Sequence, residues 1–125
     1  MTVILIDDDP QVLEVLRELV QRRGYEVMTY DSPMACPLYT STLASCASEY
    51  VYPNIVISDV DMPNVNGMDF IEKVYQNGYK DIRYALLTGK GIEKVNLSRM
   101  AKFGTRFFEK PLDFTEFDAW LMHTG

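Results

Sequence analysis

At 125 residues, the chain is long enough for one folded domain and too short for two, so we expect a single domain over residues 1–125. Its formal net charge of −6 disfavours direct binding to nucleic acids and to anionic membranes, because both attract clustered Lys and Arg. No apolar run approaches the roughly 20 residues of a membrane-spanning helix, and Val3–Ile6 is too short for a signal peptide. These features predict a cytoplasmic protein.

Short apolar runs alternate with helical patterns from the start of the chain. The run Thr2–Ile6 is rich in β-branched residues, as expected for a strand covered on both faces. Pro10 suits the first turn of a helix with Asp9 before it as a cap, and Gly24 ends the helical spacing that follows. Residues 25–30 predict a second strand.

The segment 31–53 gives the weakest pattern. Pro33 and Pro37 interrupt it, and residues 40–48 are small and polar. We therefore predict only a short helix in the second half of this segment.

The alternation resumes with a strand at residues 54–58. A helix that ends at Asn77-Gly78 separates it from a fourth strand at residues 82–87. A looser helical stripe follows, formed by Ile92, Val95, Met100 and Phe103.

The end of the chain predicts one more strand and one more helix. Residues 105–108 form the strand, and the helix begins around Asp113, with Glu116 in a capping-box-like pair. Its apolar face is formed by Phe114, Phe117, Trp120 and Leu121. Five β-then-α units favour an α/β fold with a parallel sheet and helices on both sides.

Polar residues stand where the predicted strands end. They are Asp7-Asp8-Asp9 after the first strand, Asp59 and Asp61 after the third, Thr88 after the fourth, and Lys110-Pro111 after the fifth. In an open parallel sheet the functional crevice lies at the carboxyl ends, where the strand order reverses. If the first and third strands are neighbours there, Asp7, Asp8 and Asp59 share one pocket.

Three carboxylates in one pocket repel one another, and a bound divalent cation offsets this repulsion better than protonation does. Oxygen ligands indicate Mg²⁺, with Mn²⁺ as the alternative. Cys36 and Cys46 have no Cys or His partner nearby in the sequence, so we expect free thiols instead of a zinc site.

The same residues supply the parts for phosphoryl transfer to a carboxylate. Asp59 would be the nucleophile and form an aspartyl phosphate. The metal would offset the charge of the transferring group, and Lys110 and the Thr88 hydroxyl would each contact another phosphoryl oxygen. Thr88 has an alternative role as the cap of the next helix.

The set Asp7-Asp8, Asp59-Val60-Asp61-Met62-Pro63 with Gly67, Thr88 and Lys110-Pro111 resembles the receiver domain of two-component response regulators. The resemblance covers essentially the whole chain in the family's order. Each motif is weak alone, but the combination is specific. It implies a flavodoxin-like three-layer fold, with a five-stranded parallel sheet in the order 2-1-3-4-5 and five helices on both faces.

The resemblance also implies the roles of the acidic residues. Asp59 takes a phosphoryl group from a histidine kinase, a phosphotransfer protein or a small phosphodonor. Asp8 binds Mg²⁺ directly and Asp7 through water, and the remaining protein ligands are Asp59 and the backbone carbonyl of Asp61. Because the chain is both catalyst and substrate in this reaction, it is not an enzyme in the ordinary sense.

A conformational switch is implied as well. In the family, the residue at Thr88 moves toward the phosphoryl group, and the aromatic residue at Phe107 follows it inward. The face made by the fourth helix, fifth strand and fifth helix then changes shape for a downstream protein, an effector domain or a second copy. The peptide bond between Lys110 and Pro111 is expected to be cis.

Four positions depart from the family or vary within it. Gly89 stands where the family mostly has Ala, which keeps the phosphoryl path open but loosens the loop. Phe107 lacks the hydroxyl that Tyr often brings. Asp61 and Lys90 occupy positions that tune phosphoryl lifetime, and we hypothesise that they pair across the site.

Two other functions are alternatives. Asp59-Val60-Asp61 also resembles the nucleophile motif of haloacid-dehalogenase-type phosphatases, although Pro63 and the mid-chain position argue against that class. A degenerate receiver could bind a partner without phosphorylation, although the intact Asp7-Asp8 pair and Lys110 argue against it.

Overall fold

The computed structural model describes residues 1–42, 52–89 and 97–123 of the protein. Within these ranges, five strands form one sheet in the order β2-β1-β3-β4-β5, and every neighbouring pair is parallel. The strands are β1 (Thr2–Ile6), β2 (Glu26–Tyr30), β3 (Ile55–Asp59), β4 (Arg83–Thr88) and β5 (Arg106–Glu109). This order and direction confirm the predicted sheet.

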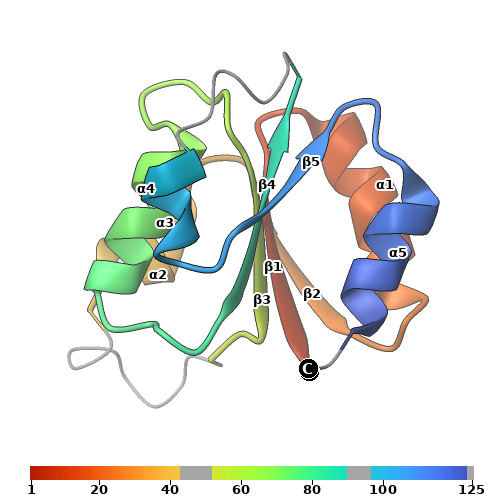
Figure 1. Ribbon diagram of the computed structural model, residues 1–125, viewed down its shortest axis with the longest axis horizontal. Coiled ribbons are helices and arrows are strands. Elements are labelled where there is room, and N and C mark those ends of the chain that lie inside the picture. Colours follow the sequence, from red (N-terminus) through yellow and green to blue (C-terminus); the bar gives the residue numbers. More distant parts are fainter. Residues whose placement is uncertain (43–51, 90–96, 124–125) are drawn as a thin grey trace.

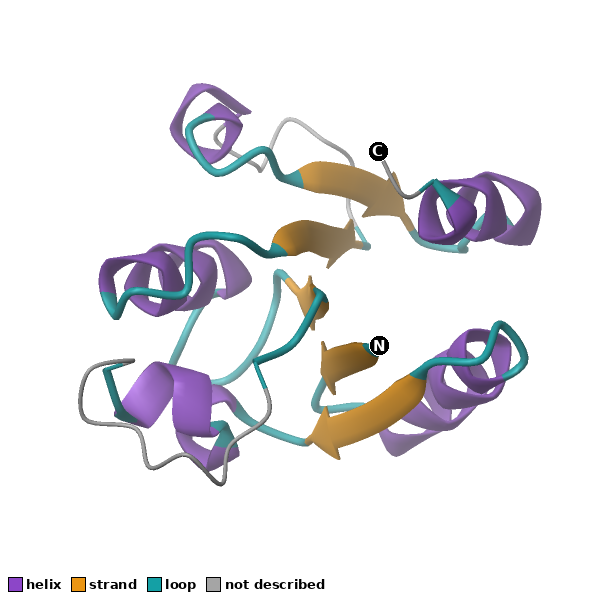
Figure 2. Cartoon of the chain, turned by 90° about the horizontal axis from the view of Figure 1, so that it is seen from below, coloured by secondary structure: helices purple, strands orange, loops and turns teal. Residues whose placement is uncertain are grey.

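Helices cover both faces of the sheet, so the fold has three layers. They are α1 (Pro10–Gln21), α2 (Pro37–Thr40), α3 (Gly67–Gln76), α4 (Leu97–Ala101) and α5 (Phe114–Met122), with the 3-10 turn η1 (Pro33–Ala35) before α2. Figure 1 shows α1 and α5 on one side of the sheet and α2, α3 and α4 on the other, and Figure 2 shows the same layers from below. None of the helices in the described ranges has both the length and the apolar character needed to cross a bilayer.

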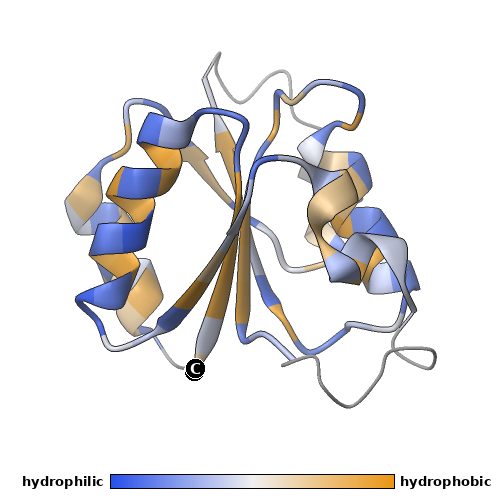
Figure 3. Cartoon of the chain, turned by 180° about the vertical axis from the view of Figure 1, so that it is seen from behind, coloured by the Kyte–Doolittle hydropathy of each residue, from blue (hydrophilic) through white to orange (hydrophobic). Residues whose placement is uncertain are grey.

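The central strands are apolar because both of their faces are covered. All five residues of β1 are buried, and alternate side chains serve different cores. Ile4 and Ile6 pack with α2, α3 and α4, whereas Val3 and Leu5 pack with α1 and α5. Figure 3 shows this pattern as hydrophobic strands between helices whose apolar sides face inward. Within these strands, charged groups are therefore confined to the ends.

An aromatic group joins β5 to α5. Phe108 contacts Phe117 and Trp120 edge to face, with ring centroids 5.4 and 5.7 Å apart. The guanidinium of Arg83 lies over the Trp120 ring, 4.5 Å from its centroid. Trp120 therefore belongs to the core between the sheet and α5, as predicted.

Side-chain caps fix the starts of three helices. The carboxylate of Asp9 accepts a hydrogen bond from the Gln11 backbone N–H at 2.9 Å, which confirms the predicted cap of α1. Asp113 caps α5 in the same way. The predicted partner of Asp113 in a capping box, Glu116, forms an ion pair with Arg106.

The segment before β3 differs from the prediction. Pro33 and Pro37 do not interrupt regular structure but begin η1 and α2, because proline fits the first turn of a helix, where its missing N–H costs nothing. The helix predicted for the second half of the segment falls mainly on residues 43–51, which lie outside the described residues.

The predicted apolar face of α5 needs one correction. Phe117 and Leu121 are buried, but Phe114 is 53% exposed. It lies in the first turn of the helix, where it lines a surface pocket together with Val12 and Val15 of α1. In the looser stripe before β5, Met100 is buried in α4, whereas Ile92 and Val95 lie outside the described residues.

The turn between β3 and α3 depends on Gly67. A Cβ atom at this position would lie 2.2 Å from the backbone oxygen of Asp59 and 3.0 Å from Leu86. The oxygen belongs to a central strand and cannot move aside. We expect Gly67→Ala to lower the free energy of unfolding by about 2–3 kcal/mol in urea denaturation.

Gly89→Ala is the matched control for this prediction. A Cβ at Gly89 would meet nothing within 4 Å. Its effect should stay within about 0.5 kcal/mol. Equal effects of the two substitutions would show that the close approach at Gly67 does not constrain the turn.

Candidate functional site

Strand register brings the predicted acidic residues together. β1 pairs with β3 so that Ile6 stands opposite Ser58, and the next residues, Asp7 and Asp59, are therefore side by side at the carboxyl edge of the sheet. The strand order reverses here, because β2 lies on one side of β1 and β3 on the other. Open α/β sheets bind their ligands at such a point.

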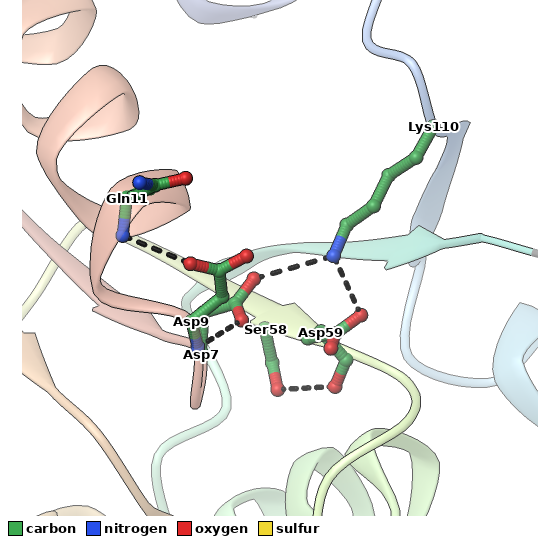
Figure 4. A network of polar contacts seen from close by, with 6 residues as sticks. All are labelled: Asp7, Asp9, Gln11, Ser58, Asp59 and Lys110. Carbon is green, nitrogen blue, oxygen red and sulfur yellow. Dashed lines mark hydrogen bonds and ion pairs between the residues drawn. The ribbon is translucent and has the colours of Figure 1, made fainter.

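Lys110 lies between the two carboxylates (Figure 4). Its Nζ atom donates to Asp59 Oδ1 at 3.2 Å and to Asp7 Oδ2 at 3.4 Å. The side chains of Asp7 and Asp59 are only 1% and 8% exposed, whereas that of Lys110 is 29% exposed. One ammonium group therefore bridges two buried acids from the rim of a pocket.

Asp8 completes an acidic cluster. Asp7, Asp8 and Asp59 each offer a carboxylate oxygen, and these oxygens lie within 4.8 Å of one another. The second oxygen of Asp7 accepts a hydrogen bond from the Asp9 backbone N–H at 2.9 Å, which fixes the orientation of this carboxylate. Three acids against one lysine leave the cluster with an excess of negative charge. This donor set fits a divalent cation that prefers oxygen ligands.

Burial changes the proton affinity of these groups. Desolvation raises the pKa of both Asp7 and Asp59, and the charge of Lys110 only partly opposes this effect. The neighbouring charges of Asp61 and Asp8 raise the pKa of Asp59 further. Burial lowers the pKa of Lys110, but the charges of Asp7 and Asp59 outweigh it, and the net pKa is raised.

Hydrogen bonds fix the chain at the end of β3. The Ser58 hydroxyl donates to the backbone oxygen of Asp59 at 2.9 Å, and the Gly67 N–H donates to the carbonyl of Val60 at 2.9 Å. Sequence reasoning missed Ser58, although a hydroxyl inside an apolar run was a usable signal. Asp61 lies in this loop and is exposed.

The other predicted residues lie around the same edge. Thr88 is buried at the end of β4, and its carbonyl accepts a hydrogen bond from the Lys110 N–H at 2.8 Å. Phe107 is partly buried against the core on the α3 side of the sheet. Gly89 is exposed, and Lys90 lies outside the described residues. The residues that Thr88 would cap in its alternative role, directly after it in the sequence, also lie outside the described residues.

The peptide bond between Lys110 and Pro111 is cis, as expected from the sequence.

The chain matches the response regulator receiver domain family over residues 3–121. It belongs to this family. As receiver domains are signalling domains, the chain is not an enzyme in the ordinary sense. The family binds Mg²⁺ at an acidic cluster, and the Asp7, Asp8 and Asp59 group of this receiver domain is such a cluster.

Two curated relatives are transcriptional regulatory proteins. The receiver domain is 33% identical over 109 residues to the C4-dicarboxylate transport transcriptional regulatory protein DctD of Pseudomonas aeruginosa, covering 87% of this chain and 22% of that protein. It is 29% identical over 115 residues to the phosphoglycerate transport system transcriptional regulatory protein PgtA of Salmonella typhimurium, covering 90% and 25%. The chain thus spans about a quarter of the length of these relatives or less.

Solved structures support the fold. A response regulator receiver domain protein from Clostridium thermocellum has a TM-score of 0.76 at 23% identity, over 96% of this chain and 90% of that one. Vibrio cholerae chemotaxis protein CheY4 has a TM-score of 0.75 at 24% identity, over 96% and 94%.

The raised pKa of Asp59 gives a prediction for stability against pH. The folded state binds this proton more tightly than the unfolded state, so ionisation of Asp59 costs folding free energy as pH rises above the ordinary value of 3.8. Asp59→Asn avoids this cost. We expect its free energy of unfolding, relative to wild type, to rise between pH 4 and neutrality in urea denaturation.

Asp81→Asn is the control for this experiment, because Asp81 precedes β4 at the opposite edge of the sheet and is exposed. The rise for Asp59→Asn should exceed any change with pH that loss of the exposed carboxylate produces in Asp81→Asn. A flat or falling difference for Asp59→Asn would contradict the raised pKa.

Proposed function

We propose that this receiver domain accepts a phosphoryl group on Asp59 in a reaction that depends on Mg²⁺ or Mn²⁺. The observation that carries the proposal is the bridge from Lys110 to the buried carboxylates of Asp59 and Asp7, with Asp8 beside them. The proposed nucleophile, the Lys110 ammonium group and the proposed metal ligands Asp7 and Asp8 line one pocket.

In the proposed reaction, a carboxylate oxygen of Asp59 attacks the phosphorus of a phosphohistidine. A P–O bond forms, the P–N bond breaks, and the imidazole leaves with the electron pair of that bond. The metal, held by Asp7, Asp8, Asp59 and the backbone carbonyl of Asp61, would offset the charge of the transferring group.

Lys110 has a separate task in this scheme. It now donates to Asp59 Oδ1, and after transfer it would pair with an oxygen of the new phosphoryl group. The Thr88 hydroxyl would donate to a further phosphoryl oxygen and draw Phe107 inward. Lys110 starts from a contact with two carboxylates, so its charge stays paired before and after the reaction.

The partners proposed for this site are of two kinds. A histidine kinase or a phosphotransfer protein would supply the phosphoryl group, and a small phosphodonor would do so in vitro. The output would pass through the face of α4, β5 and α5 to a downstream protein, an effector domain or a second copy. Relatives that are transcriptional regulators about four times as long support an effector-domain output. We place this chemistry in the cytoplasm, within the one domain of residues 1–125.

Phosphorylation by acetyl phosphate tests the acceptor directly. Wild-type protein incubated with acetyl phosphate and Mg²⁺ should gain the mass of one phosphoryl group by intact-protein mass spectrometry. Asp59→Asn should lose this gain completely, because the amide is not a competent nucleophile. Asp81→Asn should keep it.

The role of the metal is tested in the same experiment. Removal of divalent cations with EDTA should abolish the mass gain, because the unneutralised acids repel the donor. A gain that persists in Asp59→Asn would place the acceptor elsewhere. A gain that is insensitive to EDTA would remove the metal from the mechanism.

The pairing that we hypothesise between Asp61 and Lys90, a residue outside the described ranges, makes a prediction about phosphoryl lifetime. Lys90→Ala would free Asp61 and change the rate of dephosphorylation by about two- to fivefold, the range expected for one exposed ion pair. The rate is measured by the decay of phosphoprotein after removal of acetyl phosphate. Lys80→Ala is the control. It also removes one lysine, but the ammonium group of Lys80 lies over the ring of Tyr75. An unchanged rate for Lys90→Ala would contradict the pairing.

A further inference from the structure

One guanidinium group ties α4 to α3. Arg99 Nε donates to Glu72 Oε2 at 2.6 Å, and Arg99 Nη2 donates to Asp69 Oδ1 at 2.6 Å. We call these two contacts the α3–α4 clamp. The side chains of Arg99 and Glu72 are 31% and 33% exposed, so this half of the clamp is partly shielded from water. Gln76, one turn along α3, lies 3.5 Å from the other oxygen of Glu72.

The α3 side of the clamp is fixed to the strand that carries Asp59. The Gly67 N–H donates to Val60 at 2.9 Å, and the backbone of Gly67 packs directly on the carbonyl of Asp59. The Asn66 side chain caps the helix by accepting from the Met68 N–H at 2.7 Å. Asp69 lies in this first turn of α3. A shift of the helix turn that carries Asp69 would therefore disturb β3, the strand that ends in Asp59.

The α4 side is held mainly against α3. Met100 is fully buried, and Phe103, just beyond α4, contacts Tyr75 of α3 with ring centroids 4.9 Å apart. Apolar packing of this kind tolerates a small slide of one helix on another. The clamp is less tolerant, because a guanidinium that serves two carboxylates fixes both distance and angle.

We propose that the α3–α4 clamp holds α4 in the position of the unphosphorylated domain and opposes the change that phosphorylation of Asp59 drives. This inference rests on the proposed function. A contact made in one state alone shifts the equilibrium toward that state. Release of the clamp therefore favours the phosphorylated conformation, and Arg99 sets how readily the domain switches.

Binding of a phosphoryl analogue tests this inference. Trifluoroberyllate with Mg²⁺ mimics an aspartyl phosphate and is titrated into the full chain by calorimetry. Arg99→Ala should bind it about three- to tenfold more tightly than wild type, within the usual range of coupling between sites. Glu72→Gln should shift affinity in the same direction. The double variant should exceed Arg99→Ala by little, because both changes remove the same contact.

Arg23→Ala is the matched control, because Arg23 follows α1 and forms an ion pair with Asp118 of α5 on the opposite side of the sheet. It should bind the analogue with wild-type affinity. Arg99→Lys keeps the charge without the two-point geometry and should give a smaller shift than Arg99→Ala. Thermal unfolding of each variant confirms that it is folded.

The outcomes separate the two proposals. Wild-type or weaker affinity in Arg99→Ala and Glu72→Gln, with normal binding by the wild-type protein, would overturn the clamp and leave the proposed function intact. An equal gain of affinity in Arg23→Ala would also overturn it. Failure of the wild-type protein both to bind the analogue and to take phosphate from acetyl phosphate would overturn the proposed function, and the clamp with it.

Discussion

Lys110 joins the carboxyl ends of three strands through its ammonium group and its backbone N–H. It contacts Asp7 after β1 and Asp59 at the end of β3, while its own backbone N–H bonds to Thr88 at the end of β4. Both acids have a raised pKa despite this cation, which shows that one positive charge does not compensate for their burial. The pocket retains negative charge that a divalent cation can neutralise, and the proposed phosphoryl transfer depends on this neutralisation.

The sheet explains why these groups meet only here. β1 and β3 are apolar on both faces, since one face packs on α1 and α5 and the other on α2, α3 and α4. A carboxylate inside either strand would lose its hydration without a partner. Charged groups are thus excluded from the interior of these two strands and gather where their hydrogen-bond ladders end.

Local sequence signals predicted the strands and the position of polar residues at their carboxyl ends. The runs that precede Asp7 and Asp59 are apolar and β-branched, and the cis bond before Pro111 followed from the family motif. These features depend on residues that are neighbours in sequence. The alternation of strand and helix then placed them at one edge, because parallel strands end on the same side.

Other features depend on partners that are distant in sequence. Pro37 was taken as an interruption, because nothing local distinguishes a breaker from the first residue of a helix. Phe114 matched the apolar spacing of α5 but extends over a surface pocket beside α1. The contact of Arg99 with Glu72 joins residues 27 positions apart, and a single sequence gives no signal for such a pair.

The division of the interior into two cores also separates the chromophores of the protein. Trp120, the only tryptophan in the sequence, packs with Phe108 and Phe117 on the α5 side. Tyr79 and Tyr84 are buried in the other core, and Tyr30, Tyr39 and Tyr75 pack against it. Tryptophan emission therefore reports on the layer between the sheet and α5, while near-ultraviolet absorption of these tyrosines reports mainly on the opposite layer. One side of the sheet can therefore be followed through tryptophan emission without any added label.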